Sequence, residues 1–237
     1  VQGPPRVAGR AVFLYVRRLG YRYAVAGGAA LIFGLDTMAW VYSKVFFREP
    51  LAALALLATA YFLLGLRPVV AGGAAGPQRL TYALLAAASY GLAITTKETM
   101  FAALPVLLLV GAWYLSEGKG PQRPPARQQI GLLIFVTLAS AAVFGLILLY
   151  NSIVLGYLAL GSRRVPDFIS TFFAVTPETW NAMAQMPFNP GKGLFTHSPI
   201  LLLSLFAIPI LLRRRRFGEL LLPLLLVPVF MRAYSTA

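Results

Sequence analysis

Apolar stretches recur along this chain at intervals of about 25 to 30 residues, and this repetition limits its fold more than any other feature. Most approach the length at which an α-helix crosses the hydrocarbon of a bilayer, about 20 residues. Charged residues make up only 12% of the chain, whereas a soluble domain carries about 25%. The pattern predicts an all-α, polytopic transmembrane helix bundle, with residues 1–237 forming a single transmembrane domain.

About seven spans are expected, and several are short enough that their end residues must lie at the membrane interface. They are Ala24–Tyr42, Leu51–Leu66, Leu80–Thr95, Phe101–Leu115, Ile130–Tyr150, Pro199–Leu212 and Leu220–Phe230. The sequence starts at Val1 and stops just past the last of these. We therefore expect an internal fragment of a longer protein, lacking its N-terminal spans, first outer loop and C-terminal region.

Basic residues near the ends of the spans predict the orientation. One group of loops holds Arg6, Arg10, Arg17, Arg18, Arg22, Arg67, Arg79, Lys119, Arg123, Arg127 and Arg213–Arg216. The other holds Lys44, Arg48, Lys97, Arg163, Arg164, Lys192 and Arg232. Because cytoplasmic loops carry an excess of Lys and Arg, we place the larger group inside. The net charge of +14 then reflects topology, and we expect no nucleic-acid partner.

The outer side carries most of the chemistry in this topology. Four of the seven acidic residues lie there: Glu49, Glu98, Asp167 and Glu178. The long outer loop, residues 151–198, also lies there and contains His197, the only histidine. Its many aromatic residues indicate a packed or membrane-lying element, and loops of this length tend to be functional or disordered.

Two short outer turns each place a base beside an acid, Lys44 to Glu49 in one and Lys97–Glu98 in the other. Charges at the lip of a membrane span need partners, because burying them unpaired is costly. One interpretation is that each base neutralises the acid within its own turn, and for Glu98 this stays open. For Glu49 we favour a functional role, because Pro50 fixes the first turn of the next helix and leaves Glu49 at a defined N-terminus.

Asp36 lies within the first span and is open to two interpretations. A carboxylate inside a span is a functional hypothesis by default, and Asp36 shares a helix face with Trp40 and Lys44. It is equally consistent with a buried acid bonded to Thr37 or to a neighbouring helix. The chain contains no cysteine, which excludes disulfides and thiolate chemistry.

Four motifs, in order, resemble the polyprenyl-phosphate-dependent glycosyltransferases of the GT-C fold. This superfamily includes the protein O-mannosyltransferases and the lipid A aminoarabinose transferases. The motifs are AWVYSKVFFREPLAALALLATAYFLL (Ala39–Leu64), GLAITTKETMFAALP (Gly91–Pro105), LYNSIVLGYLALG from Leu149, and FNPGKGLFTHSPILLLSL from Phe188. In the first motif, Glu49-Pro50-Leu51 matches the acidic residue that opens a span after an outer turn in that superfamily.

The resemblance implies an inverting membrane glycosyltransferase. It would move a sugar from a polyprenyl-phosphate carrier to a lipid, glycan or protein on the outer face of the plasma or inner membrane. Glu49 is the implied catalytic-site acid, which orients the acceptor, a metal or the donor, while the general base would lie in the missing first outer loop. Cations that stabilise the leaving phosphate and other substrate contacts are expected among Lys44, Arg48, Lys97, Glu98, Tyr157 and Lys192.

A divalent metal ion is an open alternative as a cofactor, with His197 and Glu49 as ligands. A lone histidine at the start of a span is more often an interface residue, and partner ligands are scarce. A multi-pass transporter or flippase is the alternative function, and a non-catalytic membrane subunit is a third. No internal repeat supports a transporter, and Asp36 is the only acid deep in a span.

Overall fold

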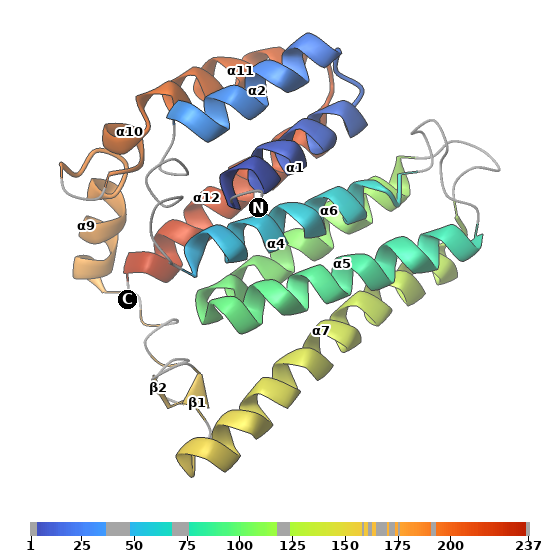
Figure 1. Cartoon of the computed structure of the whole chain (residues 1–237), viewed down its shortest axis with the longest axis vertical. Helices are drawn as coiled ribbons and strands as arrows, with labels where there is room; N and C mark the ends of the chain where they lie inside the picture. The colour runs from blue at the N-terminus through green and yellow to red at the C-terminus, as the bar shows by residue number, and fades with distance from the viewer. Residues whose placement is uncertain are drawn as a thin grey trace.

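The chain folds into a bundle of helices (Figure 1). The computed structural model describes residues 4–36, 48–67, 76–117, 124–157, 159–160, 163–164, 170, 174, 176–190 and 193–235. The N-terminal elements are α1 (Pro4–Arg18), α2 (Tyr23–Asp36), α4 (Glu49–Leu64), α5 (Gly76–Thr96), η1 (Glu98–Ala103) and α6 (Leu104–Ser116). They are followed by α7 (Ala126–Leu155), β1 (Ala159–Leu160), β2 (Arg163–Arg164), α9 (Pro177–Gln185), α10 (Leu194–His197), η3 (Pro199–Leu202), α11 (Leu203–Arg213) and α12 (Phe217–Ser235). Strands β1 and β2 pair antiparallel.

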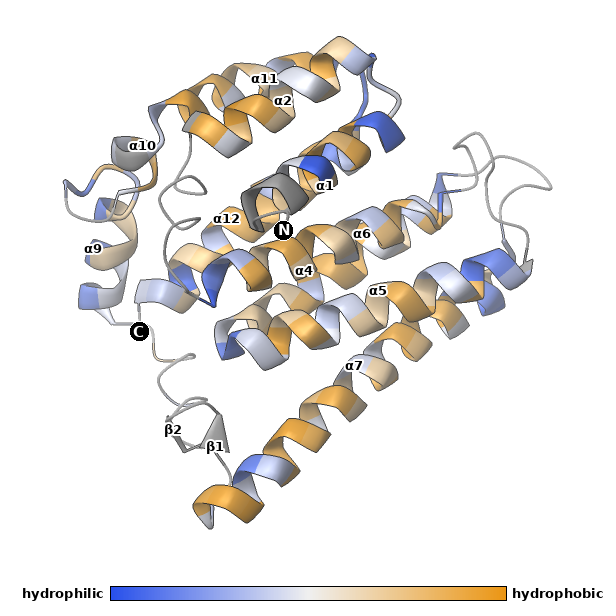
Figure 2. Cartoon of the chain, in the orientation of Figure 1, coloured by the Kyte–Doolittle hydropathy of each residue, from blue (hydrophilic) through white to orange (hydrophobic). Residues whose placement is uncertain are grey.

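Three helical segments in the described ranges are long and apolar enough to cross a membrane: Glu98–Ser116, Ala126–Leu155 and Phe217–Ser235. Helix α7, with 30 residues, is about 45 Å long, more than the hydrocarbon thickness. Shorter apolar helices occupy Tyr23–Leu35, Glu49–Leu64 and Pro199–Arg213. Hydrophobic residues predominate along most helices in the view of Figure 2, as expected for helices surrounded by lipid and other helices. The length and composition of these helices indicate a helical membrane protein.

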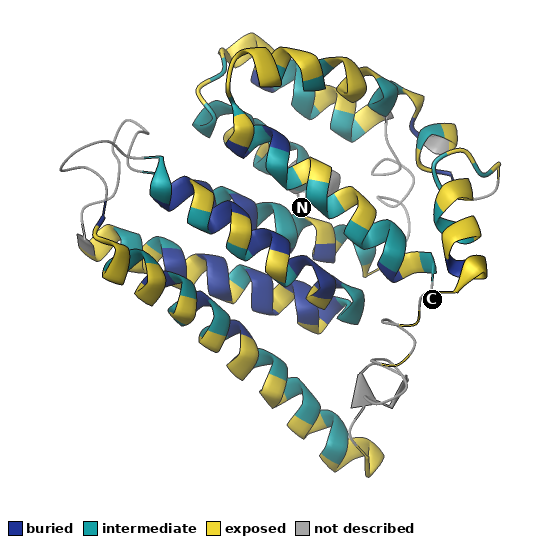
Figure 3. Ribbon diagram, turned by 180° about the vertical axis from the view of Figure 1, so that it is seen from behind, coloured by how far each residue is buried: buried dark blue, intermediate teal, exposed yellow. Residues whose placement is uncertain are grey.

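The buried core lies between α4, α5 and α6 (Figure 3). Its contacts use many small side chains, including Ala52, Ala55, Ala83, Ala86 and Ala93. Small residues let two helix backbones approach closely, which is how membrane helices gain packing energy without a hydrophobic driving force. Helix α4 accordingly makes its most extensive contacts with α5.

Two fully buried tyrosines fasten other segments to this core. The Tyr90 hydroxyl donates to the carbonyls of Met100 (2.8 Å) and Phe101 (3.1 Å), which holds η1 against α5. The Tyr114 hydroxyl donates to the Gly218 carbonyl at 3.1 Å, which holds the start of α12 against α6. Each hydroxyl is satisfied, as a buried polar group must be.

Helices α1 and α2 form an antiparallel hairpin, and this changes the predicted grouping of basic residues. A Cβ added at Gly9 would lie 3.8 Å from the Ala30 carbonyl oxygen, halfway along α2. Arg10 therefore lies level with the middle of α2. It does not lie at the end with Arg17 and Arg18, where the loop assignment placed it.

The predicted outer loop 151–198 is largely structured where it is described. Helix α7 continues to Leu155, and α9 packs against α12. Arg232 of α12 donates a hydrogen bond to the Ala174 carbonyl, which ties the loop to the end of α12. Phe188 and Phe195 pack together with ring centroids 5.4 Å apart, while Trp180 and Phe188 remain more than half exposed.

Candidate functional site

Glu49 begins α4 at one end of the bundle. The sequence puts Pro50 in the first turn, where its fixed φ and missing N–H suit a helix start. A carboxylate in the first turn is also favoured by the positive end of the helix dipole. The Glu49 side chain is therefore held at a defined place, and it remains 39% exposed.

Lys97 reaches Glu49 from the junction between α5 and η1. The Lys97 Nζ donates to Glu49 Oε1 at 2.8 Å. Helices α4 and α5 are antiparallel neighbours, so the start of one lies beside the end of the other. The base of one turn thus pairs with the acid of the other turn. The interpretation that Lys97 neutralises the adjacent Glu98 is wrong for this structure.

Tyr234, near the end of α12, covers Lys97. The Lys97 ammonium lies 4.7 Å from the centre of the Tyr234 ring, a cation–π contact. Burial alone would lower the pKa of Lys97. The hydrogen bond that Lys97 donates to Glu49, the Tyr234 side chain and the negative charge of Glu49 outweigh burial and raise the pKa above its ordinary value. Lys97 is accordingly a cation at every physiological pH.

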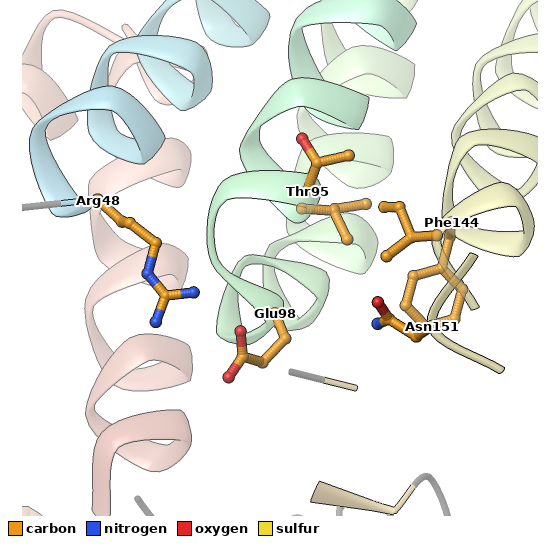
Figure 4. A pocket seen from close by; sticks show the side chains of 7 residues that line it. Arg48, Thr95, Glu98, Phe144 and Asn151 are labelled. Atoms are coloured by element: carbon orange, nitrogen blue, oxygen red, sulfur yellow. The ribbon is translucent and has the colours of Figure 1, made fainter. Parts of the chain in front are cut away.

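Next to this pair, a pocket opens between the same turns and α7 (Figure 4). Its lining is Arg48, Ile94, Thr95, Glu98, Phe144, Ile147 and Asn151. Arg48 and Glu98 extend toward the open end of the helices (Figure 4), and no ion pair to either is present among the described residues. The volume is about 170 Å³, below the roughly 300 Å³ of a typical ligand pocket. The pocket therefore suits one small polar group.

The site residues predicted from the sequence divide into two groups. Glu49, Lys97, Arg48 and Glu98 come together at this end, as described above. Tyr157 follows the left-handed Gly156 at the end of α7 and is 39% exposed, outside the pocket lining. Lys44 and Lys192 lie outside the described residues.

The metal prediction has no support in the part of the chain that is described. His197 ends α10, but its side chain lies outside the described residues. No cluster of three or more His, Cys, Asp or Glu side chains suited to a metal ion occurs within those ranges. Asp36 ends α2, and its side chain is also outside them.

The backbone N–H groups at the end of the Gly-Lys-Gly motif form hydrogen bonds with nearby carbonyls of the chain. The N–H groups of Gly193, Leu194 and Phe195 donate to the carbonyls of Asn189 (2.7 Å), Met186 (3.1 Å) and Pro187 (2.9 Å). A Cβ at Gly193 would lie only 2.4 Å from the Asn189 oxygen, so this close approach requires glycine. These N–H groups are consequently not available to hold a phosphate.

The sequence reasoning missed Tyr234, Asn151 and Phe144. Phe144 stacks on Phe101 at 5.1 Å and forms the apolar wall of the pocket. The signal for Tyr234 was present, because the end of the seventh predicted span falls on the same side as the Lys97 turn. Asn151 lies within the third quoted motif. It lines the pocket because α7 continues to Leu155, past the end of the predicted span at Tyr150.

The opposite end of the bundle, which we call the arginine end, holds a second polar network. It comprises the α1–α2 turn (Leu19–Arg22), Arg67, Glu117 and the α11–α12 turn (Arg214–Arg216) with Glu219. Glu117 pairs with Arg67 and accepts from the Trp113 indole N–H at 2.8 Å. Glu219 pairs with Arg216 at 3.0 Å and accepts from the Tyr21 hydroxyl at 2.6 Å. Both carboxylates are thus held by two partners.

Comparison with known proteins adds no relative to this description. No protein-family model, no curated protein and no solved structure matches the chain.

Proposed function

We propose that this chain is the membrane-spanning part of a GT-C-like glycosyltransferase with about seven spans. It would transfer a sugar from a polyprenyl-phosphate carrier to a lipid, glycan or protein acceptor at the outer face of the plasma or inner membrane. The observation that carries the proposal is the ion pair between Glu49 and Lys97, which joins two turns matching separate motifs of that superfamily. The pocket beside it is lined by further charged and amide groups.

The chemistry of such a transfer needs a stabilised leaving group. The bond between the sugar C1 and the carrier phosphate oxygen breaks, and its electron pair stays on the phosphate. A bond forms between C1 and the acceptor oxygen on the opposite face, which inverts the anomeric centre, and the acceptor proton passes to a base. Fixed cations beside the leaving phosphate lower the barrier.

The Glu49 end supplies groups of the kind this step requires. Lys97 donates one of its three N–H bonds to Glu49 and contacts the Tyr234 side chain, which leaves at least one N–H for a phosphate. Arg48 lines the pocket with a planar fork of donors, which suits two phosphate oxygens at once. Glu98 and Asn151 line the same pocket and offer acceptors and donors for sugar hydroxyls. Glu49 holds Lys97 in place, and its side chain, 39% exposed, is open to an acceptor.

Transfer assays with the complete protein in proteoliposomes test the proposal. Radiolabelled polyprenyl-phosphate hexose and pentose serve as donors, and label in the acceptor fraction is counted. We expect Glu49→Gln and Lys97→Met each to lower transfer about 100-fold or more. Glu178→Gln is the control, because Glu178 is an exposed acid on the long loop and should leave transfer unchanged.

A charge swap separates catalysis from plain helix anchoring. The double variant Glu49→Lys with Lys97→Glu keeps an ion pair between the two turns but exchanges the positions of the charges. An anchoring pair tolerates this exchange, whereas we expect the swapped variant to be as inactive as Lys97→Met. Full transfer by Glu49→Gln or by the swapped variant would contradict the site.

A transporter is the alternative function, and the same vesicles distinguish it. If the labelled carrier crosses the bilayer and no acceptor becomes labelled, the protein moves lipid-linked sugar without transferring it. The proposed transferase labels the acceptor without net movement of the carrier.

A further inference from the structure

Two helix hairpins turn at the arginine end with the same backbone motif. After α1, the Gly20 N–H donates to the Arg17 carbonyl (3.0 Å) and the Tyr21 N–H to the Val16 carbonyl (3.4 Å). After α11, the Arg215 N–H donates to the Leu212 carbonyl (3.0 Å) and the Arg216 N–H to the Leu211 carbonyl (2.9 Å). Both are Schellman motifs, which cap the last carbonyls of a helix and need a left-handed residue after it.

The two turns differ at that left-handed residue. In the α1–α2 turn it is Gly20, with φ 93°. In the α11–α12 turn it is Arg215, with φ 53°, and no other non-glycine residue of the described chain has positive φ. A Cβ is unfavourable in this region, so glycine would make the more stable turn. The backbone gives no reason for arginine at position 215, and the side chain must supply one.

The neighbouring Arg216 is already occupied within the protein. It pairs with Glu219 at 3.0 Å, and its guanidinium lies 5.0 Å from the centre of the Tyr21 ring. This contact joins the two turns and neutralises Glu219, the carboxylate that residues of both turns bind. Arg213, Arg214 and Arg215 are exposed, and among the described residues none of them forms an ion pair.

An apolar surface lies directly beside these three arginines. Leu205, Phe206, Ile210 and Leu212 of α11 are 46% to 70% exposed. At the start of α12, Phe217 packs edge-on against Trp113 at 6.0 Å, and both rings are 37% exposed. Aromatic rings of this kind are typical of the headgroup depth of a membrane. Three guanidinium groups that have no ion pair among the described residues thus lie beside exposed apolar side chains.

We propose that Arg213, Arg214 and Arg215 form a binding site for the phosphate of an anionic phospholipid headgroup, with the acyl chains lying along α11. A lipid fits better than a free phosphate, because the charged turn continues into exposed apolar helix. The strained Arg215 is retained for this contact. The inference depends on the membrane-spanning character of the chain and not on the transferase proposal.

Native mass spectrometry of the detergent-solubilised protein measures this binding. The protein is equilibrated with equal amounts of phosphatidylglycerol and phosphatidylcholine of the same chain length, and the ratio of the two bound lipids is recorded. Each of the three arginines in contact with the headgroup should favour the anionic lipid about fivefold. We expect a clear excess of bound phosphatidylglycerol, which the variant Arg213→Gln with Arg214→Gln and Arg215→Gln abolishes.

Two single variants make the test specific. Arg215→Gly should lower the lipid ratio about fivefold while raising the thermal midpoint, because it relieves the turn. If Arg215 had only a structural role, its replacement would change the thermal midpoint without lowering the lipid ratio. Arg127→Gln is the matched control, since Arg127 is an exposed arginine at the start of α7 and should not change the ratio.

Several results would overturn the proposal. One is an unchanged lipid ratio in the triple variant, provided that its thermal midpoint shows a folded protein. Another is an Arg215→Gly protein that is stabilised yet binds phosphatidylglycerol as before. A loss from Arg127→Gln as large as the loss from Arg215→Gly would indicate a general charge effect. Displacement of the bound lipid by excess inorganic phosphate would assign the site to a free anion.

Discussion

The two ends of the bundle use charge in opposite ways. At the arginine end, Glu117 and Glu219 each have an arginine partner and an aromatic donor. At the Glu49 end, Glu49 has one partner, and Glu98 has no ion pair among the described residues. The same residue types therefore form a closed network at one end and a partly open one at the other.

The aromatic residues sharpen this contrast. The Arg18 guanidinium lies between two tyrosine rings, 4.4 Å from Tyr61 and 4.5 Å from Tyr82. Arg67 lies 5.4 Å from the ring of Tyr114. A fully satisfied polar network stabilises and fixes a structure, whereas unused donors and acceptors leave room for a ligand. We infer that the paired carboxylates Glu117 and Glu219 hold the helices of the arginine end together, whereas the charged groups of the Glu49 end are placed to bind a substrate.

The largest expected effect concerns the side of the membrane that each end faces, because labelling from outside should either occur or not occur. The chain has no cysteine, so single cysteines can be placed at Glu98 and at Arg127. We expect an impermeant maleimide to label the Glu98→Cys protein in intact cells. The Arg127→Cys protein should react only after the membrane is permeabilised, since excess basic residues mark the cytoplasmic side. Labelling of both in intact cells would contradict the proposed orientation.

Close packing at the arginine end should make it sensitive to added volume. A Cβ at Gly218 would lie 2.7 Å from the Tyr114 ring and 3.1 Å from Glu117 and Trp113. We expect Gly218→Leu to lower the free energy of unfolding by about 3 kcal/mol, measured by denaturation in mixed micelles. Gly131 in α7 has no atom within 4 Å of an added Cβ, so Gly131→Leu is the control and should cause no loss.

Removal of the Glu117 charge should cause the next largest loss of stability. Glu117→Gln keeps an acceptor for Trp113 but leaves Arg67 without a counter-charge in a site that is 20% exposed. We expect a loss of about 2 kcal/mol in the free energy of unfolding, with sugar transfer by the remaining folded protein unchanged. The exposed Glu178→Gln should change stability by less than about 0.5 kcal/mol. A loss of sugar transfer in the folded Glu117→Gln protein would contradict the separation of a stabilising end from a substrate-binding end.

The sequence predicted the helices well because hydropathy follows the bilayer. The third expected span, Leu80–Thr95, lies within α5 (Gly76–Thr96), and the fifth, Ile130–Tyr150, within α7 (Ala126–Leu155). The helical fold is confirmed, and the length and composition of three helices indicate a membrane protein. Seven spans stay a prediction, since three segments of the described chain are long and apolar enough to cross alone.

The side-chain contacts were less predictable, because they join residues far apart in sequence. Neighbouring charges suggested the pair Lys97 with Glu98, but the antiparallel packing of α4 and α5 gives Lys97 with Glu49. Tyr21 with Glu219 joins residues 198 positions apart, which no local pattern encodes. The predicted topology could thus assign a charged residue to one end of the bundle. Its partner could be identified only from the way the helices pack.

The smallest expected effect is on stability at the Glu49 end. Lys97→Met removes an ion pair whose side chains are 20% and 39% exposed, and such pairs contribute at most about 1 kcal/mol. Because the pKa of Lys97 is raised in the folded protein, its contribution is complete below the unfolded value of about 10.4. It disappears as the pH rises through the folded value. The difference in unfolding free energy between the native protein and Lys97→Met should therefore be constant between pH values of about 7 and 9 and vanish in stronger alkali. A difference of several kcal/mol, or one that persists in alkali, would mean that this end also holds the bundle together.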